Sequence, residues 1–516
     1  MTSQRDNGVS ARTEHAVSRR AVVKSLGAGS LGMLASLGGV PPVAPAPVTA
    51  RSAATASQRD SRPNIILIVL DDMRADDLAA MPAVQSLLVD RGISFANFMT
   101  TAPGCAPARA SILRGQYPHN HGVLRSQGEQ GGFARFHELG NERSTIATWL
   151  QDAGYTTALI GKYLNHYPFE EGNPNGFPAT YRPPGWNEWA GISDAWYYNF
   201  TVNENGQPVR YRGKKHYSTD VLAAKARDFV IRTASTAQPF FLYLAPRAPH
   251  GPADAANRHL SAFDGTIAPR PPSYDESDVS EKPSWVRELP RLSHAQIAQL
   301  DEVYLDRLRS LLAVDEMVAN LVETLSGADI LDSTYIVFTS DNGYHLGEHR
   351  MLMEKGSPYE EIVRMPLVVR GPGVPTGRTI TALASGADLA PTFTAWAGAP
   401  TPSFVDGRSL APLLDRGAMP RPWREGVLIE RFADHNARST KEPQFNALRT
   451  EEFIYVEFVT GEAELYDLTT DPFQLHNRIT TADPEFVAAL SQRLAAWTTC
   501  TGDTCRTIEA QPIPRR

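Results

Sequence analysis

Residues 65–72, IILIVLDD, join six consecutive apolar residues to a pair of aspartates. A continuous apolar run of this kind predicts a strand buried on both faces of a sheet. Three similar runs also end at polar residues: 157–160 before Gly161-Lys162, 240–244 shortly before His250, and 335–339 before Asp341-Asn342. Because ligands bind beyond the carboxyl ends of parallel strands, we expect these polar side chains to meet at one edge of the sheet.

The segments between these runs have helical patterns, at about 82–91, 145–153 and 293–325. Strands that alternate with helices predict an α/β fold with a large, mostly parallel sheet flanked by helices. Two stretches rich in Pro, Trp and Tyr, 167–208 and 253–290, are expected to be long loops facing a substrate. Past Leu414, alternating segments such as 453–458 and a helix over 484–497 predict a smaller α+β domain.

The overall charge gives no basic surface for nucleic acid, since the 516-residue chain has a formal net charge of −7. Hydrophobic residues make up 42% of the chain, an ordinary value for a globular protein. Residues 57–516 contain 44 basic and 55 acidic residues, a net charge of −11. An anionic substrate would therefore need a local cluster of positive charge.

The N-terminus predicts an export signal. Residues 18–24, SRRAVVK, resemble a twin-arginine motif, and 54–56, ATA, offer a cleavage site. The weakly apolar stretch 26–43 is too short and too rich in glycine for stable membrane insertion. We therefore expect a signal peptide over 1–56, a catalytic domain over 57–414, a C-terminal subdomain over 415–516, and a periplasmic or secreted protein. The alternative is a disordered tail with a chance arginine pair.

The three cysteines divide unevenly. Cys500 and Cys505 are close enough in sequence to form a disulfide in an oxidising compartment, or to remain two free thiols. Cys105 has no neighbouring thiol in the sequence, and an odd cysteine in an exported protein calls for an explanation.

The explanation lies in the motif around Cys105. Residues 105–109 read CAPAR, and the motif continues through Gly115 to Val123. This C-x-P-x-R motif resembles the type I sulfatases of the alkaline phosphatase-like superfamily, and the resemblance runs from about residue 63 to 477. Arg114 stands where threonine is usual and Ala108 where serine is common. The resemblance implies that maturation machinery oxidises Cys105 to formylglycine. One hydroxyl of the hydrated aldehyde would attack sulfur, and the other would later help to expel sulfate.

The aspartate pairs suggest a metal site. Asp71, Asp72, Asp341 and Asn342 offer hard oxygen ligands, which suit Ca²⁺ or Mg²⁺ rather than zinc. The resemblance adds the formylglycine at Cys105 to this metal centre. A helix cap or a solvated turn would explain either pair alone.

Three cations and a histidine complete the expected site. In the family, a lysine in a strand-end G-K motif and a lysine after D-N-G hold the sulfate oxygens, which corresponds to Lys162 and Lys355 here. Arg109 is expected to stabilise charge in the transition state with them. His250 stands where a histidine binds sulfate and can protonate the leaving alcohol. Solvated lysines and a capping histidine are the alternatives.

One departure points to a branch of the family. Many sulfatases have G-K-x-H, but residues 161–165 are GKYLN, with Leu164 in the histidine position. This variant and the tail over 464–477 resemble the N-acetylglucosamine-6-sulfatase and heparan-sulfate sulfatase branch. Without a histidine at position 164, the sequence leaves open which group bonds to the formylglycine. The candidates are His121, His166 and His345. His121 and His345 are also predicted to bind substrate.

The expected substrate is a sulfated sugar such as N-acetylglucosamine-6-sulfate, and the tryptophans at 186, 189 and 196 could stack on its ring or simply pack a loop. An aryl sulfatase, or a phosphonate or phosphate ester hydrolase on the same scaffold, is the nearest alternative. A non-catalytic binder of sulfated glycans is disfavoured, because a binder needs no nucleophile.

Overall fold

The computed structural model describes residues 60–168, 176–192, 196–353, 355–415, 423–433 and 442–513. The predicted export signal lies outside the described residues, and the proposed domain boundaries stay predictions. Residues 57–516 form one compact unit. No helix among the described residues is both long enough and apolar enough to cross a membrane.

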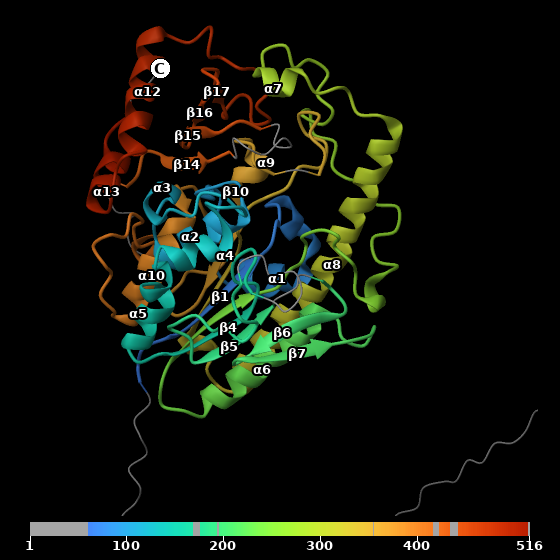
Figure 1. The fold of residues 1–516 in the computed structure, drawn as a ribbon, viewed down its shortest axis with the longest axis vertical. Helices are drawn as coiled ribbons and strands as arrows, with labels where there is room; N and C mark the ends of the chain where they lie inside the picture. The colour runs from blue at the N-terminus through green and yellow to red at the C-terminus, as the bar shows by residue number, and fades with distance from the viewer. Residues whose placement is uncertain are drawn as a thin grey trace, which may run out of the picture. The chain divides into compact units, whose positions relative to one another are not determined.

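A ten-stranded mixed sheet forms the centre of this unit within the described residues (Figure 1). In spatial order its strands are β12 (Arg378–Ile380), β2 (Ile93–Phe95), β11 (Leu367–Arg370), β9 (Thr334–Ser340), β1 (Asn64–Leu70), β8 (Phe240–Ala245), β4 (Thr156–Gly161), β5 (Glu188–Ile192), β6 (Phe200–Glu204) and β7 (Gln207–Tyr211). The four strands expected from the sequence are β1, β4, β8 and β9. They lie side by side and parallel, as predicted.

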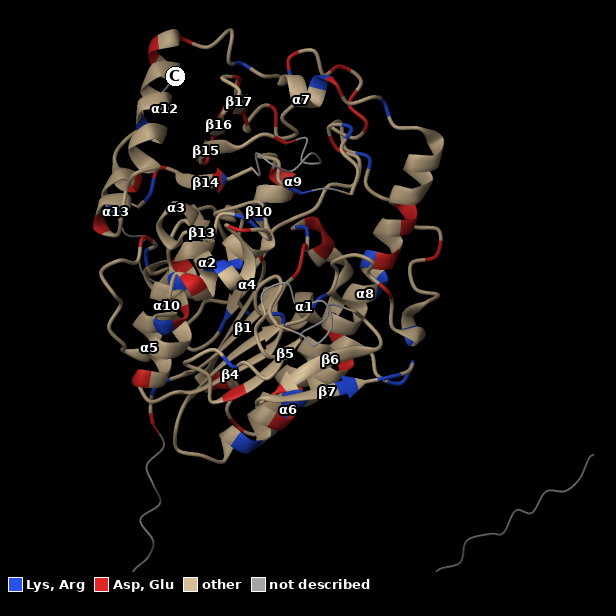
Figure 2. Ribbon diagram, in the orientation of Figure 1, with Lys and Arg blue, Asp and Glu red and all other residues tan. Residues whose placement is uncertain are grey.

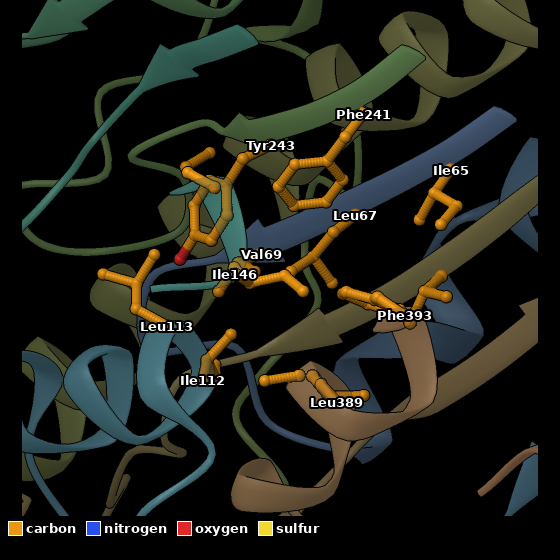
Figure 3. Close-up of a cluster of buried hydrophobic side chains, with 14 of the residues drawn as sticks. Ile65, Leu67, Val69, Ile112, Leu113, Ile146, Phe241, Tyr243, Leu389 and Phe393 are labelled. Carbon is orange, nitrogen blue, oxygen red and sulfur yellow. The ribbon is translucent and has the colours of Figure 1, made fainter. Parts of the chain in front are cut away.

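Both faces of β1 are buried, which explains its unbroken apolar run. Ile65, Leu67 and Val69 pack on one face in a cluster with residues of α2 (Cys105–Arg114), α5 (Ile146–Asp152) and α10 (Leu389–Ala397) (Figure 3). Ile66, Ile68 and Leu70 pack on the other face in a cluster with residues of α6 (Ser218–Ala234) and α8 (His294–Gly327). Because side chains alternate along a strand, only a strand covered on both sides needs apolar residues at every position.

The sheet departs from the predicted parallel arrangement toward its edges. β11 pairs antiparallel with β9 and β2, and β6 pairs antiparallel with β5 and β7. The expectation of a single long loop over 167–208 was wrong, because β5, β6 and the start of β7 lie within it. The aromatic residues of this stretch are largely core residues: Trp186 and Trp189 are buried.

Helices are present within each of the segments that were predicted to be helical. Their bounds are α1 (Pro82–Val84), α2 (Cys105–Arg114), α3 (Pro118–His121), α4 (Gly132–Glu138), α5 (Ile146–Asp152), α6 (Ser218–Ala234), α7 (Ser284–Arg287), α8 (His294–Gly327), α9 (Glu360–Val363), α10 (Leu389–Ala397), α11 (Ala411–Leu414), α12 (Pro484–Trp497) and α13 (Asp503–Ala510). A π-helical turn, 85–89, continues α1. Basic and acidic residues are interspersed along α6 and α8 rather than gathered by sign (Figure 2).

The C-terminal part contains the predicted antiparallel sheet and closing helix. A four-stranded antiparallel sheet consists of β14 (Val427–Arg431), β15 (Phe445–Arg449), β16 (Phe453–Phe458) and β17 (Ala463–Asp467). A smaller sheet consists of β10 (Arg364–Met365), β3 (Phe98–Met99) and β13 (Ala384–Ser385). Cys500 and Cys505 are joined in a disulfide, which decides between the two alternatives that the sequence left open.

Candidate active site

The carboxyl ends of the four parallel strands bring the expected polar residues to one edge of the sheet. The register pairs Leu70 with Ser340 and Gly161 with Ala245, so the strands end at the same level. Asp71 and Asp72 follow β1, Lys162 follows β4, His250 follows β8, and Asp341 and Asn342 follow β9. Gly161 has a φ of +119°, and a side chain there would lie 2.0 Å from the Ala245 carbonyl oxygen. Glycine therefore allows β4 to deliver Lys162 close beside β8.

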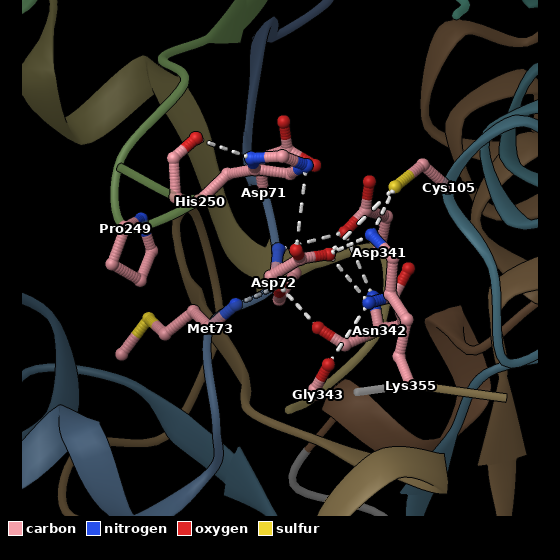
Figure 4. Close-up of polar contacts among 12 residues, drawn as sticks. Asp71, Asp72, Met73, Cys105, Pro249, His250, Asp341, Asn342, Gly343 and Lys355 are labelled. Atoms are coloured by element: carbon pink, nitrogen blue, oxygen red, sulfur yellow. Dashed lines mark hydrogen bonds and ion pairs between the residues drawn. The ribbon is translucent and has the colours of Figure 1, made fainter. Parts of the chain in front are cut away.

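The acidic residues form one buried cluster (Figure 4). Asn342 donates from Nδ2 to Asp72 Oδ1 at 2.7 Å, and the Asp72 amide donates to Asp341 Oδ1 at 3.1 Å. Asp72 itself has a φ of +66°, the left-handed conformation that aspartate tolerates better than most residues. This backbone turn directs the Asp72 carboxylate toward Asn342 instead of continuing the strand.

Cys105 lies at the first position of α2, next to the acidic cluster. Its Sγ is 3.7 Å from Asp72 Oδ1 and 2.7 Å from the Lys355 ammonium nitrogen. Gly104 precedes it in an extended conformation, and the helix that follows directs its N-terminal amide groups toward this position. A group at residue 105 therefore lies where negative charge is stabilised, both by the helix terminus and by a lysine.

Arg109 lies one turn further along the same helix and is completely buried. It donates from Nε to Asp341 Oδ2 at 2.7 Å, and its other nitrogens bond to the carbonyl groups of Lys162 and Leu70. Its donors hold Asp341 and the ends of two strands. The role of Arg109 in stabilising the transition state stays a prediction.

The two lysines contact the carboxylates directly. Lys162 donates to both oxygens of Asp71 at 2.7 Å, and Lys355 donates to Asp72 Oδ1 at 2.5 Å. Burial alone would raise the pKa of Asp71, but the Lys162 ammonium and neighbouring cations hold that pKa well below its usual range. Both carboxylates are therefore ionised, as metal ligands must be.

His250 also borders the cluster, with one of its ring nitrogens within 4.8 Å of Cys105 Sγ (Figure 4). Its Nε2 is 3.6 Å from Asp72 Oδ2. Burial lowers the pKa of His250, partly against the attraction of Asp71 and Asp72. The Tyr197 hydroxyl donates to the His250 carbonyl oxygen at 2.7 Å, which fixes the backbone of this loop.

The arrangement fits a hard divalent cation. One ligand atom from each of Asp71, Asp72, Cys105 and His250 lies within 4.8 Å of the others. The buried Oδ1 of Asn342 has no hydrogen-bond partner among the described residues, although its amide nitrogen has two. A buried amide oxygen beside three carboxylates would gain a partner from a cation.

An open cleft of about 330 Å³ reaches this cluster at Lys355. One wall is the turn before α2, with Pro103, Gly104 and Pro107, and another is the stretch 124–127. The C-terminal sheet supplies the third wall through Glu430, Arg431 and Phe432 at the end of β14. Lys355, which lines the cleft and contacts Cys105, therefore links the cleft to the cluster.

Several predicted residues lie away from the cluster. His121 is buried and bonds to Ser111 Oγ at 3.1 Å, and His345 is buried and bonds to Ser357 Oγ at 2.7 Å. His166 is exposed, in the turn that follows β4. Of the three tryptophans, only Trp196 is exposed, at 57%. The predicted substrate roles of His121 and His345 thus gain no support from their positions.

Two contacts were missed by reasoning from the sequence. Lys355 was expected only to hold an anion, but its ammonium nitrogen also contacts Cys105 Sγ. Arg247 was not singled out, yet its Nη2 lies 3.0 Å from His250 Nδ1. Its place three residues before His250 was the one signal that could have indicated it.

Comparisons with known proteins agree with this geometry. Residues 63–399 match the sulfatase family, and residues 347–499 match the family described as N-sulphoglucosamine sulphohydrolase, C-terminal. An N-acetylglucosamine-6-sulfatase from Homo sapiens is 33% identical over 484 residues, covering 86% of each chain. An arylsulfatase from Volvox carteri is 31% identical over 511 residues, covering 88% of this chain and 77% of the relative. A solved structure in complex with its substrate D-glucosamine-2-N,6-O-disulfate has a TM-score of 0.70 at 26% identity, covering 84% of this chain and 97% of that one.

Proposed function

Because the chain belongs to the sulfatase family and is a sulfuric ester hydrolase, we propose that it removes sulfate from sulfated sugars, N-acetylglucosamine-6-sulfate in particular. The observation that carries this proposal is the position of Cys105, whose Sγ contacts the ammonium group of Lys355 and lies 3.7 Å from Asp72 Oδ1. Lys355 in turn lines the cleft.

We propose that formylglycine, not the thiol, is the nucleophile at position 105. Burial raises the pKa of the Cys105 thiol to about 12, although Lys162 and Lys355 work against that rise. An unmodified thiol would therefore be protonated at neutral pH, and the thiol is a much weaker nucleophile than the thiolate. The hydrated aldehyde supplies one hydroxyl to attack sulfur and a second from which the sulfate can be expelled.

Asp71, Asp72, Asp341 and Asn342 would hold the metal, which we propose is Ca²⁺ or Mg²⁺ because every one of these donors is oxygen. Such an ion supplies Lewis-acid polarisation of the ester and favours ionisation of a hydroxyl beside it. Arg109 supports this ligand set by holding Asp341 through Nε. Besides these oxygen donors, Cys105 and His250 offer ligand atoms within 4.8 Å of those of Asp71 and Asp72, and Cys105 is the residue proposed to be modified.

Lys162 and Lys355 would bind the sulfate oxygens. Lys162 bonds to Asp71 and Lys355 bonds to Asp72, two carboxylates that would also bind the metal ion. The lysine side chains are 14% and 24% exposed. Their ammonium groups can therefore turn toward an anion at residue 105, and the charge they place there is the kind of preorganised contact that stabilises a transition state. His250 would donate from Nε2 to the oxygen of the leaving alcohol.

The sugar specificity rests on the relatives and the cleft together. A relative 33% identical over most of both chains is an N-acetylglucosamine-6-sulfatase, and the cleft is large enough to admit more than a sulfate group. The arylsulfatase from Volvox carteri, at a similar identity, keeps an aryl sulfate as the second candidate.

Fully matured enzyme assayed against a panel of esters decides between these substrates. We expect kcat/KM for N-acetylglucosamine-6-sulfate to exceed that for galactose-6-sulfate, for a nitrophenyl sulfate and for a phosphonate monoester. The preference should lie in contacts to the sugar, because every sulfate ester presents the same group to the lysines. Equal turnover of the panel would remove the sugar assignment and leave the sulfatase activity standing, whereas faster phosphonate cleavage would overturn both.

Export through a twin-arginine signal is also part of the proposal. The Cys500–Cys505 disulfide is consistent with an oxidising compartment. A fusion of residues 1–56 to a reporter that is active only outside the cytoplasm tests this, and Arg19→Lys with Arg20→Lys should abolish the signal. Secretion that survives both substitutions would exclude the twin-arginine route.

A further inference from the structure

Arg307 is a buried arginine on the long helix α8. Its side chain is 1% exposed, and it lies on the same face of the helix as Leu311 and Val314, which pack in one core cluster with β1. A guanidinium has five N–H donors and keeps its charge in proteins, so a buried one needs acceptors nearby. The acceptors of Arg307 therefore indicate what this charge contributes.

Two nitrogens of Arg307 donate to carbonyl groups that follow different strands. Nη2 donates to the Asp72 carbonyl oxygen at 2.7 Å, and Nη1 donates to the Pro249 carbonyl oxygen at 3.3 Å. Nη2 also donates to Asp77 Oδ2 at 3.0 Å, and the guanidinium carbon lies 4.5 Å from the ring centroid of Tyr344. One buried side chain thus contacts the segments that follow three neighbouring strands, β1, β8 and β9.

The contact with Asp72 supports an uncommon backbone conformation. Asp72 has a φ of +66°, and residues other than glycine persist in this region where surrounding contacts hold them. The Asp72 amide donates to Asp341 Oδ1, and the Asp72 carbonyl oxygen accepts from Arg307. The same turn places the Asp72 carboxylate beside Asn342 and Lys355. A contact that fixes this backbone therefore also orients a proposed metal ligand.

The contact with Pro249 acts on the loop that carries His250. His250 Nε2 lies 3.6 Å from Asp72 Oδ2, so this loop and the Asp72 turn meet at the acidic cluster. Arg307 donates to the backbone of both segments through two nitrogens of one rigid, planar group. The separation between the turn and the loop is therefore constrained by a single guanidinium.

We propose that Arg307 is a positioning residue that holds the Asp72 carboxylate and the His250 ring at a fixed separation before substrate binds. Arg307 is not one of the residues that line the cleft, so it acts through backbone groups rather than on the substrate. This role rests on the proposed function, in which Asp72 binds the metal and His250 donates to the leaving oxygen. The alternative is a purely structural role, limited to the ion pair with Asp77.

Calorimetric titration of chelator-treated, folded protein with Ca²⁺, and separately with Mg²⁺, tests this role without reference to activity. Arg307→Met should weaken the affinity for the ion that the unaltered protein binds by about tenfold to a hundredfold, the range for residues that orient metal ligands. Arg307→Lys keeps a charged donor and should recover part of that affinity.

A double variant guards against misfolding, because Arg307→Met leaves Asp77 without its buried cation. Arg307→Met combined with Asp77→Asn removes that uncompensated charge, and the new amide oxygen can still accept from the Arg74 amide, as Asp77 Oδ2 does now. The folded double variant should show the same weakening of ion affinity. Affinity equal to that of the unaltered protein would overturn the proposal.

Arg424→Met is the matched control. Arg424 is also a buried arginine, but it bonds to Asp388 at 2.6 and 2.7 Å rather than to the backbone beside the acidic cluster. Its replacement should lower the free energy of unfolding and leave the ion affinity unchanged. Equal losses of ion affinity in Arg307→Met and Arg424→Met would indicate general destabilisation and contradict the positioning role.

Kinetics at saturating ion concentration supply a second readout. In folded Arg307→Met, kcat for a sulfate ester should fall by about tenfold or more, because the His250 loop has lost a contact that added ion cannot restore. KM should change less than kcat, since Arg307 does not line the cleft. A loss confined to KM would contradict the proposal.

Failure of this role can be told apart from failure of the proposed function. If the unaltered protein binds neither ion, the ligand set is wrong and the role of Arg307 falls with it. If the unaltered protein binds an ion and the folded double variant binds it as tightly, the role of Arg307 is wrong and the ligand set stands. If ion affinity depends on Arg307 but sugar sulfates are not hydrolysed, the positioning role stands and the substrate assignment fails.

Discussion

Among the clusters of described residues that bury carboxylates against cations, two invite comparison, and one of these two is the candidate active site. At the carboxyl edge of the large sheet, Asp71, Asp72 and Asp341 meet Arg109 and two lysines. Near the C-terminus, Arg424 bonds to both oxygens of Asp388 at 2.6 and 2.7 Å and to Glu509 at 3.0 Å, and Tyr117 and Arg408 complete the network. Burial and ion pairing are common to both.

The two clusters differ in the solvent exposure of their side chains and in whether a buried polar atom is left without a hydrogen bond. The side chains of Arg424, Asp388 and Glu509 are all 0% exposed, so the C-terminal network is closed to ligands. In the sheet-edge cluster Lys162, His250 and Lys355 keep 14%, 28% and 24% of their side chains exposed. That cluster also borders a cleft and contains the unbonded Oδ1 of Asn342. A buried charge cluster thus indicates chemistry only where something can reach it.

Removing the nucleophile position should have the largest effect and leave the fold intact. Cys105→Ala, which leaves no side chain that could become an aldehyde, should lower kcat by about 10⁴-fold or more, the scale seen when a nucleophile is lost. The melting temperature should stay close to that of the parent protein. Substantial activity in Cys105→Ala would remove residue 105 from the mechanism.

Lys355→Met should come next, because it deletes a cation that contacts both Cys105 and Asp72. Loss of a charge-stabilising donor costs about 10²–10³ in kcat. Lys225→Met is the matched control: this lysine pairs with Glu204 at 2.8 Å, away from the cleft. Steady-state kinetics on folded protein should separate the two variants, and equal rates in both would contradict the role of Lys355.

Arg424→Met addresses the closed cluster and should affect stability instead of catalysis. Removing one partner of a buried ion pair strands the other charges and costs about 3–5 kcal/mol. We expect denaturant unfolding to show this loss, while the activity per folded molecule stays near that of the parent. A drop in kcat without a drop in stability would mean that the C-terminal cluster takes part in the reaction after all.

The smallest effect concerns His121, whose pKa burial lowers to about 3. Since the unfolded chain binds a proton at a higher pH than the folded chain, this histidine should make stability fall as pH decreases below about 6.5. The slope should be about 1.4 kcal/mol per pH unit until the folded-state pKa is reached. His121→Asn should reduce that slope in unfolding experiments between pH 7 and about 5. Unchanged slopes would show that His121 is not a buried neutral group.

Much of this architecture follows from local sequence patterns. Residues 65–70 of β1 form an unbroken apolar run because both faces of the strand are covered, and the aspartates that follow mark the sheet edge. The edge strands β5 to β7 escaped prediction because their aromatic residues pack the core without regular alternation.

Site residues that directly follow a strand could be predicted from the sequence. Residues whose hydrogen-bond partners are distant in the sequence could not. The buried hydrogen bond from Arg109 Nε to Asp341, 232 residues later, could not be read from local patterns. His121 and His345 lie in polar networks whose partners no spacing rule reveals.

The central claim is that a modified residue 105, placed at the open cluster, carries the reaction. Protein produced with graded amounts of maturation machinery provides the direct test: mass spectrometry gives the fraction of formylglycine in the peptide containing residue 105, and an assay gives activity on the same samples. Activity should rise in proportion to that fraction and extrapolate to zero at none. Full activity in protein whose residue 105 is entirely unmodified cysteine would contradict the account.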